Sequence, residues 1–333
     1  MKRFLPWVLL CVLLWQATAH ACEWPGPGGW QTLATGVHVW APEPQEVNPA
    51  NGGRVMPVTV IEDGGEAWVI DPGPSLRAGQ QLQQWVACRL GAQVRAVFNT
   101  HAHAENVLAN AAFAEAQQRG ELHIHATAGT AQAMARRCQA CLEDLHAHAG
   151  DEAMAGTTIV LPDRTLRPGD QFTLGRHTLV VGPSWAAHSA DDVLLWHPAH
   201  RIAWVGGMAY QNRLPELAQG SLRGWLAALR ELRAWAPSWV VGTSVSAATH
   251  GGGMAASLQQ TESYLLDLQA AVLQTMETGG QGALAERISL PAYAGWAGYA
   301  SRQGFNAQRA WRELEPLWMD GSLPRQPHTS AGN

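Results

Sequence analysis

Short apolar runs and helical repeats of apolar residues alternate along the chain and predict its secondary structure. Runs rich in β-branched and aromatic residues, bounded by Gly, Pro, Asn or Asp, predict strands. Apolar residues spaced three or four apart predict helices. We expect strands at 37–40, 55–61, 67–71, 94–98, 123–125 and 239–241, and hairpins within 166–181 and from 192–196 with 201–205. We expect helices at 76–90, from just after 106 to about 118, and at 127–145, 222–235, 258–276, 283–288 and 307–317.

The order of these elements predicts the fold. Two β-then-α halves follow one another, and only helices follow the second half. A sheet that is apolar on both faces must be covered on both, so two sheets packed together with helices outside is the expected arrangement. We therefore expect an α/β (α+β) protein, an αββα sandwich of two mixed β-sheets flanked by helices. The sandwich domain would span residues 22–250, and a helical C-terminal extension residues 251–333.

Composition and charge exclude some classes of partner. The 333-residue chain has 22 Lys and Arg residues against 27 Asp and Glu residues, and its net charge is −5. This acidic balance lacks the basic surface on which nucleic-acid binders rely, so we expect no nucleic-acid partner. The chain also has 14 histidines, and histidine is the commonest metal ligand in proteins.

The N-terminus resembles a targeting segment rather than part of the fold. Lys2 and Arg3 precede an apolar run at 4–15, and the small residues of a cleavage site follow at 19–21. This order predicts a signal peptide over residues 1–21 and a periplasmic or secreted protein. The run is shorter than the roughly 20 residues that span a bilayer. We expect no membrane span after cleavage; an uncleaved anchor is the alternative.

Four cysteines would remain after cleavage, namely Cys22, Cys88, Cys138 and Cys141. An even number in an exported chain indicates disulfides, whose connectivity the sequence does not define. For the pair Cys138 and Cys141 we favour a structural bridge, with a redox pair and a metal half-site as alternatives. No second C-x-x-C is present to complete a four-sulfur zinc site.

The most informative segment follows the expected strand at 94–98. His101 and His103 lie two residues apart, and in extended backbone such residues face the same side. Both imidazoles can therefore reach one ion. Zinc needs three or four N, O or S ligands, so a further ligand must come from elsewhere in the chain.

Three motifs resemble those of one family, the metallo-β-lactamase-fold hydrolase superfamily. The motif T-H-x-H-x-D-H is matched at 100–106, the Asp-x-Gly after a strand at 71–73, and the H-T-x-x-D segment at 188–192. The resemblance covers about residues 30–245. The segment 306–315 looks like the tail of exported members known as quinoprotein relay system zinc metallohydrolases.

The resemblance implies a three-histidine metal site. His101, His103 and His188 match the ligands of the family's first metal, and Asp71 would orient a ligand histidine or the motif loop. Glu105, in place of the motif's Asp, would act as general base or bind the ion itself. Three imidazoles and a water suffice for catalytic zinc, so we expect Zn²⁺, about one ion per chain.

The family's second metal site departs from its pattern here. Its ligand positions read Glu105, Asn106, Gly207 and, at the last position, Thr243. Asn and Thr are poor zinc ligands and Gly has no side chain, so we expect the complete second site to be lost. His250, followed by three glycines, is an alternative last ligand.

Most other histidines are expected to be scaffold. We expect structural roles for His123 and His125, with a second metal pair as the alternative. His146 and His148 are expected on the loop after the C-x-x-C helix, near where the family places substrate-contacting loops, with a contact to the site as the alternative. The remaining histidines are interpreted as surface or hairpin residues (His38, His177, His197 and His200). Trp185, three residues before His188, is interpreted as a pocket wall or a core residue.

Together these features predict an exported zinc-dependent hydrolase of a small ester, amide or thioester. The partner is a small-molecule substrate, with a periplasmic redox or quinoprotein system as a further candidate partner. The alternative is a non-catalytic periplasmic binding or accessory protein that keeps the fold without turnover. A redox role for Cys138 and Cys141 ranks third.

Overall fold

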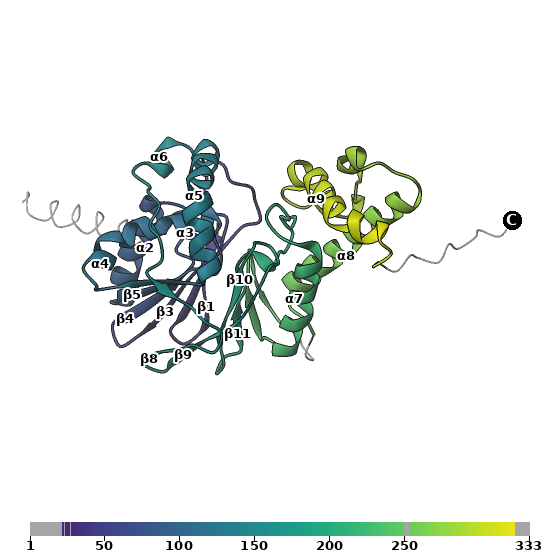
Figure 1. Ribbon diagram of the computed structural model, residues 1–333. Helices are drawn as coiled ribbons and strands as arrows, with labels where there is room; N and C mark the ends of the chain where they lie inside the picture. Colours follow the sequence, from purple (N-terminus) through teal and green to yellow (C-terminus); the bar gives the residue numbers. More distant parts are fainter. Residues whose placement is uncertain (1–21, 23, 27, 250–252, 324–333) are drawn as a thin grey trace, which may run out of the picture.

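A computed structural model describes residues 22, 24–26, 28–249 and 253–323 (Figure 1). The expected signal peptide lies outside the described residues. The first sheet has seven strands in chain order, antiparallel from β1 to β4 and parallel from β4 to β7. They are β1 (Gly28–Ala34), β2 (Val37–Pro42), β3 (Val58–Asp63), β4 (Glu66–Ile70), β5 (Gln93–Phe98), β6 (His123–Ala126) and β7 (Arg164–Thr165).

The second sheet has six strands, in the order β13-β12-β11-β10-β9-β8. Its pairs are antiparallel except β11 with β12. The strands are β8 (Gln171–Leu174), β9 (His177–Trp185), β10 (Asp192–His197), β11 (Ile202–Trp204), β12 (Trp239–Val241) and β13 (Val245–Ala247). Both sheets are therefore mixed.

Helices cover the outer faces of both sheets (Figure 1). Outside the first sheet lie α2 (Leu76–Trp85), a π-helical turn η1 (Val86–Leu90), α3 (Ala104–Val107), the 3₁₀ helix η2 (Leu108–Phe113), α4 (Ala114–Gln118), α5 (Ala128–Ala149) and α6 (Asp151–Met154). The short 3₁₀ helix η3 (Gly206–Met208) follows β11, and α7 (Leu222–Trp235) covers the second sheet. Beyond it lie α8 (Ala256–Glu277), the 3₁₀ helices η4 (Gly282–Arg287) and η5 (Pro291–Tyr293), and α9 (Tyr299–Met319).

Successive residues of a buried strand pack into different layers of the sandwich. In β4, Trp68 and Ile70 belong to the apolar core between the sheets, whereas Ala67 and Val69 belong to the core beneath α2. This is the two-residue period expected of a strand buried on both faces. The four layers confirm the expected αββα sandwich.

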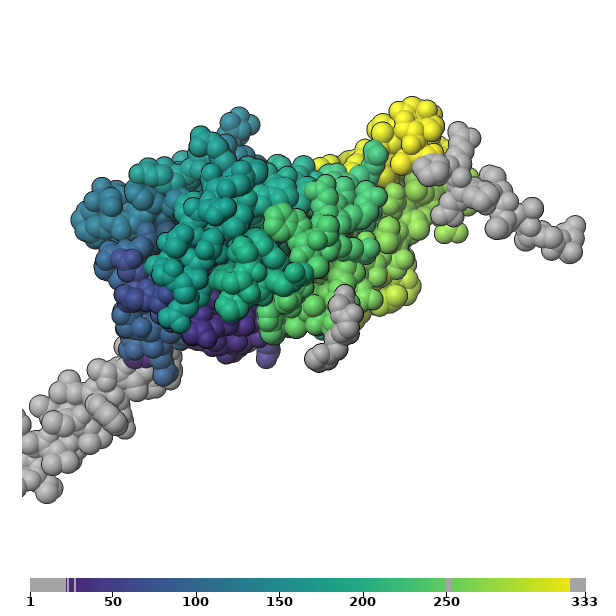
Figure 2. All heavy atoms as spheres, turned by 90° about the horizontal axis from the view of Figure 1, so that it is seen from below, coloured from purple at the N-terminus to yellow at the C-terminus, as the bar shows by residue number. Residues whose placement is uncertain are grey.

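The C-terminal extension shares a core with the second half of the sandwich. Buried residues of α7, α8 and α9 form one apolar cluster, and Glu313 of α9 accepts hydrogen bonds from Ser221 Oγ and the backbone N–H of Leu222 and Arg223 at the start of α7. An anionic side chain stabilises a helix N-terminus. In the space-filling view the extension continues the body of the molecule at one end (Figure 2).

Several expected boundaries were wrong. The sequence pattern missed β1, β7 and β13, which are edge strands or strands of two or three residues with little apolar patterning. The segment 283–288 is the 3₁₀ helix η4 rather than an α-helix, and α9 begins at Tyr299 rather than 307. The helices in the described part of the chain are all too short or too polar to cross a bilayer.

Candidate metal centre

Three buried histidines meet where the two sheets end. His101 and His103 follow β5, and His188 lies between β9 and β10. Their ring centroids are 4.9, 5.2 and 4.4 Å apart, and one ligand nitrogen from each lies within 4.8 Å of the others. His101 and His188 are almost fully buried and His103 is 8 % exposed. The structure thus brings together the three histidines that the motifs indicated.

Hydrogen bonds orient two of the rings toward a common point. His188 Nδ1 lies 2.9 Å from the backbone carbonyl of Glu216, to which it can only donate, so its Nε2 carries the lone pair. That Nε2 lies 2.7 Å from His103 Nδ1. His101 Nδ1 lies 3.0 Å from Thr100 Oγ1, and its Nε2 is buried without a partner among the described residues.

These nitrogens fit a metal ion. Burial, together with the neighbouring histidines, holds the pKa of His101 and of His188 well below the usual value, so both rings are neutral. A neutral imidazole nitrogen with a lone pair can bind a metal ion, and the buried His101 Nε2, which has no hydrogen-bond partner among the described residues, is costly unless a ligand satisfies it. The donor set of three imidazoles matches zinc in catalytic sites.

Asp71 lies beneath the histidine loop. Its carboxylate accepts hydrogen bonds from Thr100 N at 2.9 Å and from Thr100 Oγ1 at 2.6 Å. Thr100 Oγ1 in turn accepts from His101 Nδ1, so a chain of hydrogen bonds runs from Asp71 to His101. Burial raises the pKa of Asp71 to about 7, against the opposing hydrogen bonds from Thr100 and Asn106. Its contacts are those of a residue that orients a metal ligand.

The positions of the family's second site serve other purposes here. Asn106 is buried beside Asp71, and its Oδ1 has no partner among the described residues. Gly207 packs against His188, because a Cβ there would lie 1.9 Å from His188 Cδ2. Thr243 Oγ1 donates to the backbone carbonyl of Ala209. Glu105 is half-buried in the first turn of α3 and is not part of the three-histidine cluster, so its role as ligand or base stays a prediction.

A partly buried polar network behind His188 was not anticipated from the sequence. The Glu216 carboxylate pairs with Arg302 Nε of α9 at 3.1 Å, and Arg302 also pairs with Glu46 in the loop between β2 and β3. Trp225 and Tyr210 pack on His188, with ring centroids 5.3 and 5.9 Å away. No motif marks these residues.

The cysteines correct one expectation. Cys22 and Cys88 form a disulfide, which confirms that the chain contains one. Cys138 and Cys141 are free thiols, so the structural bridge expected between them was wrong. Both lie within α5, which covers the histidine loop; the Cys138 thiol approaches the Ala102 carbonyl at 3.9 Å.

The other histidines mostly belong to the scaffold. His146 and His148 lie within α5 rather than on a loop, and pair with Asp151 and Asp144. His123 pairs with Asp163, and His125 stacks on Phe98.

His177 and His197 lie in the expected hairpins, β8 with β9 and β10 with β11, but both are fully buried and in contact, so the surface alternative is wrong for them. His200 is exposed and His38 partly buried. Trp185 is half-buried and donates to Glu231 of α7. His250 lies outside the described residues.

Comparison with known proteins decides the family. A sequence model of the metallo-beta-lactamase superfamily matches residues 52–243, which is more than half of the chain. The chain belongs to the metallo-β-lactamase superfamily. No curated protein matches the sequence.

Solved structures of metallo-β-lactamases share the fold. The metallo-beta-lactamase from Pontibacter korlensis is 20 % identical, with a TM-score of 0.54, over 72 % of this chain and 99 % of the other. The metallo-beta-lactamase FIM-1 from Pseudomonas aeruginosa, in its mono-zinc form, is 15 % identical, with a TM-score of 0.53, over 74 % of this chain and 97 % of the other. At this identity the likeness shows the fold. A metallo-β-lactamase fold with a three-histidine cluster indicates a metallo-hydrolase.

Proposed function

We propose that this chain is an exported zinc-dependent hydrolase that cleaves a small ester, amide or thioester at a mononuclear site. The observation that carries the proposal is the convergence of the ligand nitrogens of His101, His103 and His188 within 4.8 Å of one another. A metallo-β-lactamase is also known in a mono-zinc form, which supports a site with one ion. Zinc bound there would supply Lewis acidity and would lower the pKa of water to about 7.

The residues around the cluster would perform the remaining tasks. Asp71, through Thr100, and the Glu216 carbonyl hold His101 and His188 with their Nε2 atoms toward the ion. Glu105 lies two residues beyond His103, on the first turn of α3, and we assign to it the acceptance of a proton from the attacking water. The burial of the cluster favours a small substrate.

One observation favours a second candidate, a non-catalytic binding or accessory protein. All three histidines are nearly inaccessible, and the side chains of the second metal site are replaced or used in packing. A binding protein tolerates such a closed site, whereas a hydrolase must open it for each substrate.

Turnover measurements on zinc-loaded protein separate the two. We would assay the chain without residues 1–21 against small esters, thioesters and amides. If the chain is a hydrolase, we expect saturable turnover, which His101→Ala should abolish. Glu105→Gln should lower the turnover by roughly 10²–10⁴-fold, the usual contribution of a general base. Zinc bound at the three histidines with no turnover on any of these substrates would favour the binding protein.

A further inference from the structure

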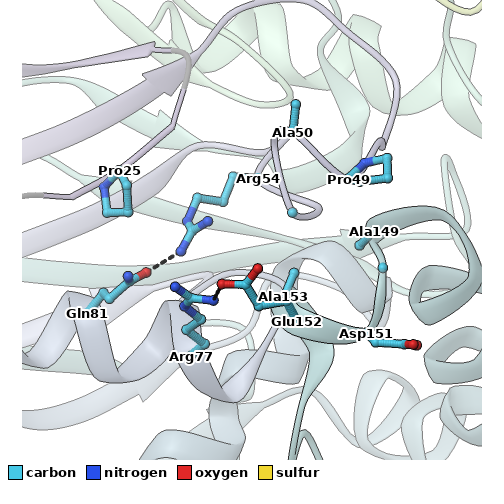
Figure 3. Close-up of a pocket in the computed structure, with 12 residues that line it drawn as sticks. Pro25, Pro49, Ala50, Arg54, Arg77, Gln81, Ala149, Asp151, Glu152 and Ala153 are labelled. Atoms are coloured by element: carbon cyan, nitrogen blue, oxygen red, sulfur yellow. Dashed lines mark hydrogen bonds and ion pairs between the residues drawn. The ribbon is translucent and has the colours of Figure 1, made fainter.

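A cavity with two arginines in its lining lies away from the histidine cluster. Its volume is about 400 Å³, and its walls come from the loop around Pro49, from α2, and from the corner between α5 and α6. Its polar side chains are those of Arg54, Arg77, Gln81, Asp151 and Glu152 (Figure 3). None of the three clustered histidines lines it.

Arg54 is a mostly buried cation without a carboxylate partner among the described residues. Its Nη2 donates to Gln81 Oε1, and its guanidinium lies over the Trp24 ring, 5.3 Å from the centroid. Its Nε is buried and unpartnered. Burial and the nearby Arg77 lower the pKa of Arg54 to about 10. A buried charge is unfavourable unless it is paired. An anion bound beside Arg54 would therefore be stabilised.

In the part of the chain that the structure describes, Arg77 has one ion-pair partner, and that partner is exposed. Its Nη1 lies 2.6 Å from Glu152 Oε1, but the Glu152 side chain is 87 % exposed. Ion pairs of this kind contribute little because water and salt screen them. Figure 3 shows the guanidinium groups of Arg54 and Arg77 facing the same space, while the Asp151 carboxylate points away from them.

We propose that this cavity binds a small oxyanion, a carboxylate or phosphate group, between Arg54 and Arg77. Guanidinium groups present forked N–H donors that match the oxygens of both anions. The Gln81 side-chain amide, whose oxygen is engaged by Arg54, offers a further N–H donor. The site is independent of the proposed hydrolase function, because it shares no residue with the histidine cluster.

Calorimetric titration with inorganic phosphate, and separately with acetate, tests the site. The protein is the chain without residues 1–21, measured both zinc-loaded and metal-free, because anions also bind zinc. We expect saturable binding in both states; the tighter of the two anions identifies the ligand class. Arg54→Gln and Arg77→Gln should each raise Kd at least about tenfold, since a hydrogen bond between charged groups contributes about 1.5–3 kcal/mol.

Two further variants sharpen the test. Glu152→Gln removes the group that competes for Arg77, so the anion should bind several-fold more tightly. Arg95→Gln is the matched control, because Arg95 forms an exposed ion pair with Glu66 outside the cavity. If Arg54→Gln fails to fold, the Kd values of Arg77→Gln and Glu152→Gln test the site in its place. The proposal is overturned if metal-free protein shows no saturable binding, or if Arg77→Gln and Glu152→Gln leave Kd unchanged.

Discussion

His188 donates its Nδ1–H to the backbone carbonyl of Glu216 at 2.9 Å, and Glu216 links the candidate metal centre to the C-terminal extension through its side chain. The Glu216 carboxylate is held in turn by Arg302 of α9. The family model ends at residue 243, so part of the support for a ligand of the centre comes from outside the region it matches.

We therefore expect Arg302→Gln to weaken zinc binding by roughly 10- to 100-fold, the usual effect of losing a group that orients a metal ligand. Competition with a chromophoric chelator measures the affinity. Arg312→Gln is the control, because Arg312 is exposed on the same helix. Equal zinc affinities for the two variants would show that α9 does not support His188.

Gly207→Ala should disrupt the centre. Its new Cβ would lie 1.9 Å from His188 Cδ2, which forces the ring or the backbone to move. Overpacking of this kind costs about 1–3 kcal/mol, and the displaced ring should lower zinc affinity. Gly295→Ala is the matched control, since nothing lies within 4 Å of a Cβ there. Wild-type affinity and stability in Gly207→Ala would refute the close packing.

Alkylation should distinguish the cysteines. In the folded chain without residues 1–21, Cys22 and Cys88 are bonded, and burial raises the pKa of the Cys138 thiol to about 12. We expect little alkylation at pH 8 in the native protein and two modified thiols, Cys138 and Cys141, after unfolding without reductant. Mass spectrometry counts them. Four unreactive cysteines in the unfolded protein would show that Cys138 and Cys141 also form a disulfide.

His125 predicts a pH dependence of stability. Burial against Phe98 lowers the pKa of His125 from 6.5 to about 4. The unfolded chain then binds a proton that the folded chain does not, so the stability from neutral His125 is present above pH 6.5 and is lost as the pH falls toward 4. His125→Gln removes this dependence.

The measurement is urea unfolding of the wild type and His125→Gln between pH 7.5 and 4.5. The stability advantage of the wild type should shrink as the pH falls through this range. A His125→Gln difference that does not change with pH would contradict the scaffold role.

Local spacing carried most of what the sequence could predict. The strand followed by His101 and His103 marks two candidate ligands, because backbone geometry alone sets their relative position. Strands with strong apolar patterns, such as β4 and β5, were also predicted correctly, because such a pattern lies within a few consecutive residues. The third candidate ligand, His188, required the family resemblance, since no local rule links residues so far apart in the chain.

Contacts between distant segments could not be predicted. Arg302 reaches Glu216 across 86 residues, and Cys88 pairs with a cysteine 66 residues away. The burial of His177 and His197 depends on how the strands pack, which single-sequence patterns do not encode. Gly207 was recognised as a lost ligand, but its close packing on His188 emerges only in three dimensions.

Metal analysis of the chain without residues 1–21, after zinc supplementation and dialysis, tests the central claim most directly. The account predicts about one zinc per chain, and none in the His101→Ala/His188→Ala double variant. No bound zinc in the wild-type protein would contradict the metal centre and with it the hydrolase proposal. Two zinc ions per chain would contradict the mononuclear site.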